Sequence, residues 1–107
     1  MRKSGLFVML LLICSCQPSV PELLIPEDKL VGVLVDTHVA EAAIQNLPSD
    51  LKDSLGEVYY RQIFEIHDVN EEDFEQTMSI LREDPIRLEI IYEQVMDQLS
   101  SRQAETR

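Results

Sequence analysis

Apolar residues from position 26 onward recur at spacings of three and four, which is the period of an α-helix. Pro26 suits a first helical position, and Glu27 and Asp28 follow where the helix dipole favours acids. The segment runs to about Gln45 and stops before Pro48. Its apolar residues cover most of the helix circumference, which predicts a central, buried helix. They are Leu30, Val31, Val33, Leu34, Val35, Val39, Ala40, Ala42, Ala43 and Ile44.

A second helix is predicted over about residues 51–67, with Ser49 or Asp50 as its cap. Its stripe recurs at three and four on one face, which predicts a single core-facing side. The stripe comprises Leu51, Leu55, Val58, Tyr59, Gln62, Ile63 and Ile66.

The third helix has the clearest start signal in the chain. Asn70 is a capping residue, Asp73 stands three positions later, and Val69 can pack on Phe74 as a hydrophobic staple. The core-facing stripe is Phe74, Met78 and Leu81.

Asp84-Pro85 ends the third helix and begins the fourth, as a cap followed by proline. No segment alternates with period two for long enough to suggest a sheet. The sequence therefore predicts an all-α fold, a small compact bundle of about four helices over residues 25–100, with a frayed polar tail over 101–107. The stripe of the fourth helix, over 86–99, is Leu88, Ile91, Tyr92, Val95 and Leu99.

The N-terminus has the layout of a signal peptide over residues 1–15. Arg2 and Lys3 precede an unbroken apolar run over 6–13, and small residues follow it. A run this short cannot cross a hydrocarbon core that needs about 20 helical residues. We therefore expect a cleaved signal and no permanent membrane helix here.

The four residues 13–16, Ile-Cys-Ser-Cys, resemble the lipobox that directs acylation of bacterial lipoproteins. Cys16 is the expected lipid attachment site, because Cys14 would place Ile13 where a small residue is wanted. Several acyl chains hold a protein durably on a membrane, whereas one gives only marginal binding. Residues 16–24 contain two prolines and predict an extended tether.

The negative charge of the chain excludes some classes of binding partner. Loss of Arg2 and Lys3 with the signal takes the formal net charge from −11 to −13. Such a surface repels nucleic acid and anionic lipid headgroups. Two interpretations remain open: the charge keeps a tethered domain soluble, or it meets a basic protein surface.

Asp36, His38 and Glu41 form the most suggestive polar cluster, inside the most apolar helix. His38 and Glu41 share a helix face and can supply two metal ligands, whereas a protein site wants three or four. The alternative is that Asp36 and His38 make buried hydrogen bonds or ion pairs that fix helix packing. We predict no metal site and no cofactor, and attribute His67 to the preference of helix C-termini for positive charge.

No arrangement for catalysis is evident. Cys16 is the only cysteine after the signal and would carry lipid, and no serine lies in a strand-to-helix elbow. We therefore predict no catalytic residues and no enzyme. Tyr59 and Tyr60 point about 100° apart on a helix, so either one ring is a surface anchor for a partner or both lie on a wide buried face.

Several segments together resemble a family of small Bacteroidetes lipoproteins that is catalogued only as domain of unknown function 4296. The first is Ile25-Pro26 with Leu30 and the run 33–42, Val-Leu-Val-Asp-Thr-His-Val-Ala-Glu-Ala. The resemblance implies a helical envelope lipoprotein of a Gram-negative bacterium, and no activity or catalytic residue comes with it. The later segments are Tyr60, Ile63-Phe64, His67-Asp68-Val69, Asp73-Phe74, Asp84-Pro85 and Ile91-Tyr92-x-x-Val95.

We thus expect a non-catalytic interaction or assembly subunit, held to the membrane by lipid on Cys16 and bound to an envelope protein. Gln17 behind the cysteine favours the outer membrane facing the periplasm. The alternative is a small ligand- or metal-binding lipoprotein that uses the face of His38 and Glu41.

Overall fold

A computed structural model describes residues 22–105 and contains four helices in this range. They are α2 (Glu27–Ile44), α3 (Ser49–Ile66), α4 (Glu71–Arg82) and α5 (Pro85–Glu105). No strand occurs in the described part of the chain, so the predicted all-α class is confirmed. All four predicted helices are present.

The capping signals place the starts of α4 and α5, whereas the predicted cap at Ser49 or Asp50 is wrong, because α3 begins at Ser49 after Pro48 and has no side-chain cap hydrogen bond. The Asn70 side chain accepts a hydrogen bond of 2.8 Å from the Glu72 amide at the start of α4. Asp84 accepts one of 3.3 Å from the Arg87 amide at the start of α5. Pro26 lies one residue before α2, in the cap position rather than inside the helix.

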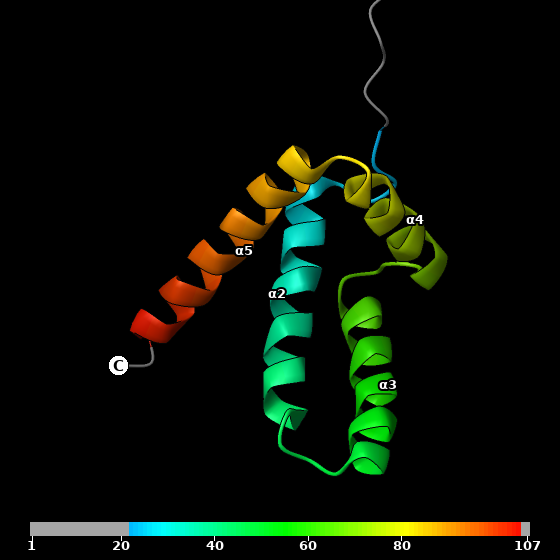
Figure 1. Ribbon diagram of the computed structural model, residues 1–107, viewed down its shortest axis with the longest axis vertical. Coiled ribbons are helices and arrows are strands. Elements are labelled where there is room, and N and C mark those ends of the chain that lie inside the picture. Colours follow the sequence, from blue (N-terminus) through cyan, green and yellow to red (C-terminus); the bar gives the residue numbers. More distant parts are fainter. Residues whose placement is uncertain (1–21, 106–107) are drawn as a thin grey trace, which may run out of the picture.

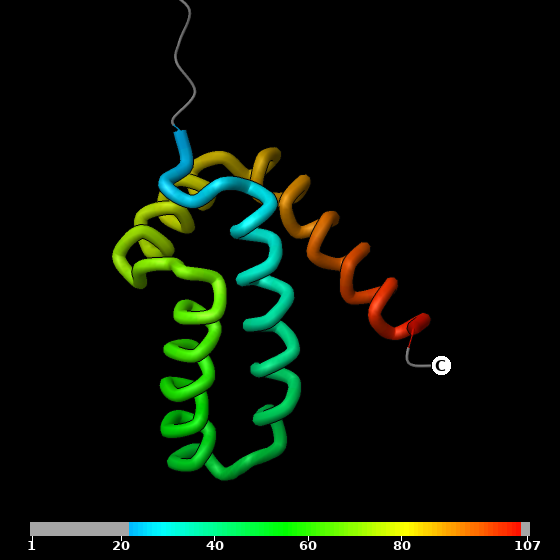
Figure 2. Tube along the Cα trace, turned by 180° about the vertical axis from the view of Figure 1, so that it is seen from behind, coloured from blue at the N-terminus to red at the C-terminus, as the bar shows by residue number. Residues whose placement is uncertain are grey.

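Helix α2 lies between α3 and α5, and α4 packs near the N-terminal end of α5 (Figure 1). The same order is seen from behind (Figure 2), where α5 diverges from α2 toward its C-terminal end. This divergence leaves Val39 of α2 and Met96 of α5 about half exposed, at 47% and 46%. The predicted burial of α2 is therefore right for its first half and only partly right for its second, where Ile44 is buried but residues 41–43 are exposed.

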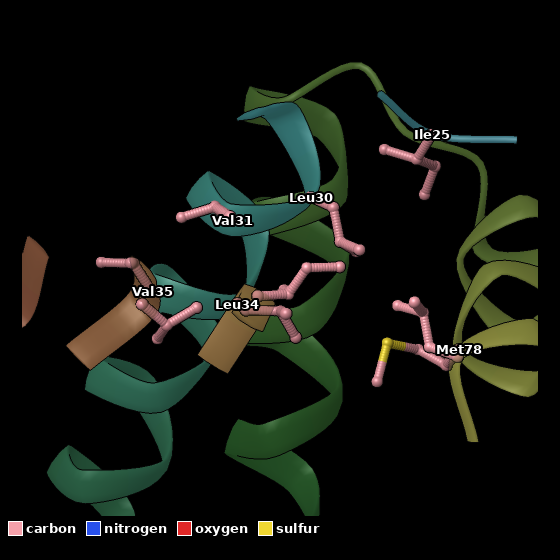
Figure 3. Close-up of a cluster of buried hydrophobic side chains, with 9 residues drawn as sticks. Ile25, Leu30, Val31, Leu34, Val35 and Met78 are labelled. Carbon is pink, nitrogen blue, oxygen red and sulfur yellow. The ribbon is translucent and has the colours of Figure 1, made fainter. Parts of the chain in front are cut away.

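The core lies where α2, α4 and α5 meet. Leu30 and Leu34 point from α2 toward Met78 of α4, and Ile25 closes the same cluster (Figure 3). The members of this core, each at most 8% exposed, are Ile25, Leu30, Val31, Leu34, Val35, Met78, Leu81, Ile91 and Val95.

Helix α3 packs differently from the expectation. Of its predicted core-facing stripe, only Ile63 is buried, and it lines a small cavity with Ala40 and Ile44 of α2. The other large apolar residues of the stripe face outward or lie at the edge of the contact. Leu51 is 51% exposed, Val58 40% and Ile66 74%.

The two ends of the chain bear on other predictions. Helix α5 continues through Glu105, beyond the predicted end of the fourth helix at residue 99. The predicted signal peptide, Cys16 and most of the tether lie outside the described residues. Between residues 22 and 105, none of the helices has both the length and the apolar character needed to cross a membrane.

Helix α3 ends in a left-handed turn at Asp68. The φ angle of Asp68 is 53°, which costs an L-residue free energy that glycine avoids. The Val69 amide donates to the Phe64 carbonyl at 2.8 Å, and the Asp68 amide donates to the Glu65 carbonyl at 3.2 Å. These two bonds form a Schellman motif, which satisfies the last carbonyls of the helix.

Asp68→Gly should raise the free energy of unfolding by about 0.5 kcal/mol, because glycine removes the left-handed strain and its own entropic cost is smaller. The matched control is Asp53→Gly in the exposed interior of α3, which should lower it by roughly 0.5–1 kcal/mol. Urea unfolding followed by circular dichroism measures both. Equal losses in the two variants would contradict the proposed strain at Asp68.

Candidate functional site

The end of α3 docks on one face of α2. Lys29, Gly32 and Asp36 are spaced by three and four and so line this face. A Cβ atom at Gly32 would lie 3.1 Å from Cε1 of His67, which is a tight contact, so the imidazole packs closely over the notch that the missing side chain of Gly32 leaves. The His67 Nε2 atom lies 2.6 Å from Asp36 Oδ2, and Lys29 Nζ donates to the Asp68 carbonyl at 3.2 Å.

Asp36 also contacts α5. Its Oδ1 atom accepts a hydrogen bond of 3.4 Å from Arg102 Nη1 of α5. The carboxylate is 28% exposed, and the His67 side chain is 21% exposed. Asp36 thus links α2, α3 and α5 by polar contacts, which is the packing role considered for it from the sequence.

His38 and Glu41 share a face of α2, as the helical spacing predicts, and both line the same groove. Asp36 points elsewhere, so the three residues do not form one cluster. The His38 side chain is exposed and makes no buried hydrogen bond, contrary to the packing interpretation. The partner of Asp36 is instead His67, which lies 31 positions further along the chain.

Glu41 pairs with Tyr60 across the two helices. The Tyr60 hydroxyl donates to Glu41 Oε1, which ties α3 to the second half of α2. Burial, the hydrogen bond to Glu41 and the negative charge of Glu41 raise the pKa of Tyr60 from 10.0 to about 12. Tyr60 is 36% exposed, whereas Tyr59 is half-buried and lines a small cavity against Ala40 and Ile44. Tyr60 is thus the more exposed of the two rings, and its role as a partner contact stays a prediction.

A broad groove runs between α2 and α3 and is closed at one end by α4. Its volume is about 1470 Å³, and it is open to solvent. Phe64 lies between two other rings of this groove: its centroid is 6.2 Å from that of Tyr60 and 5.1 Å from that of Phe74. The three rings, from α3 and α4, form an aromatic floor.

The rim of the groove is strongly acidic. Seven acidic residues line it against two basic ones, Lys52 and Arg61. In the described range, none of these nine residues takes part in an ion pair. The acidic residues are Glu41, Asp53, Glu57, Glu65, Asp68, Glu71 and Glu75.

Within residues 22–105, no three His, Cys, Asp or Glu side chains are placed so that they could hold a metal ion together. The sequence alone did not indicate that His67 contacts α2, although the two residues that it contacts, Gly32 and Asp36, share one face of that helix. Gly32 and Asp36 are spaced by four, which places a position without a side chain next to a carboxylate on one face of the helix.

Glu41→Gln should lower the pKa of Tyr60, because it removes both the negative charge and the charged acceptor. Burial, the largest cause of the shift, should keep the pKa above 10.0. Ultraviolet absorbance of the phenolate measures this, with Glu75→Gln on α4 as a control that should change nothing. An unchanged pKa in Glu41→Gln would contradict the contact.

The raised pKa also predicts a loss of stability in alkali. Because the folded protein holds the proton to about pH 12 and the unfolded chain releases it near 10.0, the Tyr60 contribution is complete below pH 10 and is lost as the pH rises toward 12. Tyr60→Phe should weaken this pH dependence of the free energy of unfolding. An unaltered dependence would argue against the shift.

Comparison with known proteins gives a family and no activity. A model of the family described as a domain of unknown function, DUF4296, matches residues 21–105, which include all four helices. No curated protein and no solved structure matches the chain. The family match extends over most of the sequence, including the Gly32 notch and the acidic groove, and the chain therefore belongs to the DUF4296 family.

Proposed function

We propose that this protein is a lipid-anchored, non-catalytic interaction subunit of the bacterial cell envelope. Acylated Cys16 holds it on the membrane, in the outer membrane facing the periplasm, where it binds another envelope protein. Eight residues lie between Cys16 and Ile25, which is 3% exposed in the core. At about 3.5 Å per extended residue, this tether keeps the domain within roughly 30 Å of the lipid.

The observation that carries the proposal is the outward-facing stripe of α3, formed by Leu51, Leu55, Val58 and Ile66. These residues are spaced by three, four and eight, so they lie along one side of the helix. Within residues 22–105 no other helix covers them: three are 40–74% exposed, and Leu55 is half-buried. A solvated apolar stripe of this length is typical of a protein contact surface.

The test is cross-linking in living cells followed by capture of the tagged protein. A Leu51→Gln/Ile66→Gln double variant should lose a specific cross-linked protein, because it removes apolar contact area without opening the core. The matched control is Ile86→Gln/Ile90→Gln on α5, where the side chains are 75% and 49% exposed. If both variants or neither lose the cross-link, the stripe is not the contact surface.

The anchor is tested in the same cells. Cys16→Ala should shift the protein from the membrane to the soluble fraction and remove the mass of the acyl groups. An unchanged mass and an unchanged membrane fraction would contradict acylation at Cys16. Elemental analysis of the purified chain addresses the ligand-binding alternative, which stoichiometric metal would favour.

A further inference from the structure

We propose that the groove between α2 and α3 binds a basic, amphipathic helical segment of another protein. This surface is distinct from the α3 stripe. The groove uses Asp53, Glu57 and Tyr60 of α3, whereas the stripe uses positions such as Leu51 and Val58. On a helical wheel these two sets lie on different flanks of α3.

The floor of the groove supplies an apolar anchor site. Phe64 and Phe74 are half-buried, and Tyr60 is 36% exposed, so all three rings keep surface that a ligand can cover. Tyr60 is fixed in place by its hydroxyl contact with Glu41, and Phe74 is held against the core. Rigid rings of this kind provide contact area at little entropic cost, and a large apolar side chain of a ligand would fill the space above them.

The acidic side chains of the rim carry negative charge that no ion pair among the described residues neutralises. Acidic residues come from all the elements around the groove, for example Glu41 on α2, Glu57 on α3 and Glu75 on α4. Lys52 and Arg61, the two basic residues of the rim, form no ion pair with them in the described structure. A ligand with lysine or arginine beside its apolar anchor is complementary to this pattern, and its approach is accelerated by the negative field.

The shape indicates a helix as the form of the ligand. Helices α2 and α3 run alongside each other (Figure 1), and the groove is lined by residues from 38 to 45 at the C-terminal end of α2, from 52 to 65 on α3 and from 71 to 75 on α4. Its volume of about 1470 Å³ exceeds the roughly 300–1,000 Å³ of small-molecule pockets. Amphipathic helices are commonly bound in grooves of this form, with the apolar face inward.

The test is titration of the purified full chain with a synthetic helical peptide that has lysine and arginine on one face and leucine and phenylalanine on the other. If the chain is acylated, it is held in phosphatidylcholine vesicles, with protein-free vesicles as the blank. Glu57→Lys/Glu75→Lys should weaken binding at least tenfold. The control Glu93→Lys/Asp97→Lys changes the net charge equally on α5, outside the groove, and should weaken it less than threefold.

A second peptide, with the apolar face replaced by serine, should bind the unaltered chain at least tenfold more weakly. Equal losses in the two protein variants, or equal binding of the two peptides, would overturn the inference, because the attraction would then be nonspecific charge. No binding at all would also overturn it. These results leave the stripe and Cys16 untouched, since their tests use different residues and a different readout.

Discussion

The placement of α3 depends on the contacts that His67 makes with Gly32 and Asp36 of α2. The notch lets the end of α3 approach the backbone of α2, and Asp36 then accepts from the imidazole at 2.6 Å. The left-handed turn at Asp68 directs the chain onward to α4, and its carbonyl is held by Lys29. Because Ile63 is the only buried residue of α3, the polar contacts of His67 with Asp36 and of Lys29 with Asp68 contribute much to the position of α3 on α2.

Both surfaces proposed for binding follow from that placement. The rotation of α3 about its axis directs Ile63 to α2 and leaves Leu51, Val58 and Ile66 on an outer flank. The same rotation brings Tyr60 to Glu41 and forms the wall of the groove. A single docking geometry therefore explains why an apolar stripe stays exposed and why an acidic groove with an aromatic floor exists beside it.

Local signals in the sequence predicted the local structure well. Asn70 and Asp84 cap α4 and α5 as expected, and Phe74, Met78 and Leu81 lie on the inner side of α4. Capping and periodicity are determined by neighbouring residues, so one sequence is enough to read them. The helical relation between His38 and Glu41 was predicted for the same reason.

The long-range contacts could not be predicted in this way. The apolar stripe of α3 predicted a core-facing side. The sequence does not show which apolar surface of α2 packs against α3, and the contact at Ile63 uses only the edge of that stripe. The pairing of Asp36 with His67 joins residues 31 positions apart, and that of Glu41 with Tyr60 joins residues 19 apart. Helix period indicates which face a residue occupies, but not which helix meets that face.

The most direct test of the contact between His67 and Gly32 is the free energy of unfolding of Gly32→Ala, measured in the parent chain and in the His67→Ala background. In the parent, the added Cβ would lie 3.1 Å from Cε1 of His67 and should push the imidazole by a few tenths of an ångström, so the change should give no gain in stability. Without the imidazole, the same change should raise stability by about 1 kcal/mol, because alanine is the better helix former. An equal gain in both backgrounds would contradict the account, since it would mean that His67 does not occupy the notch.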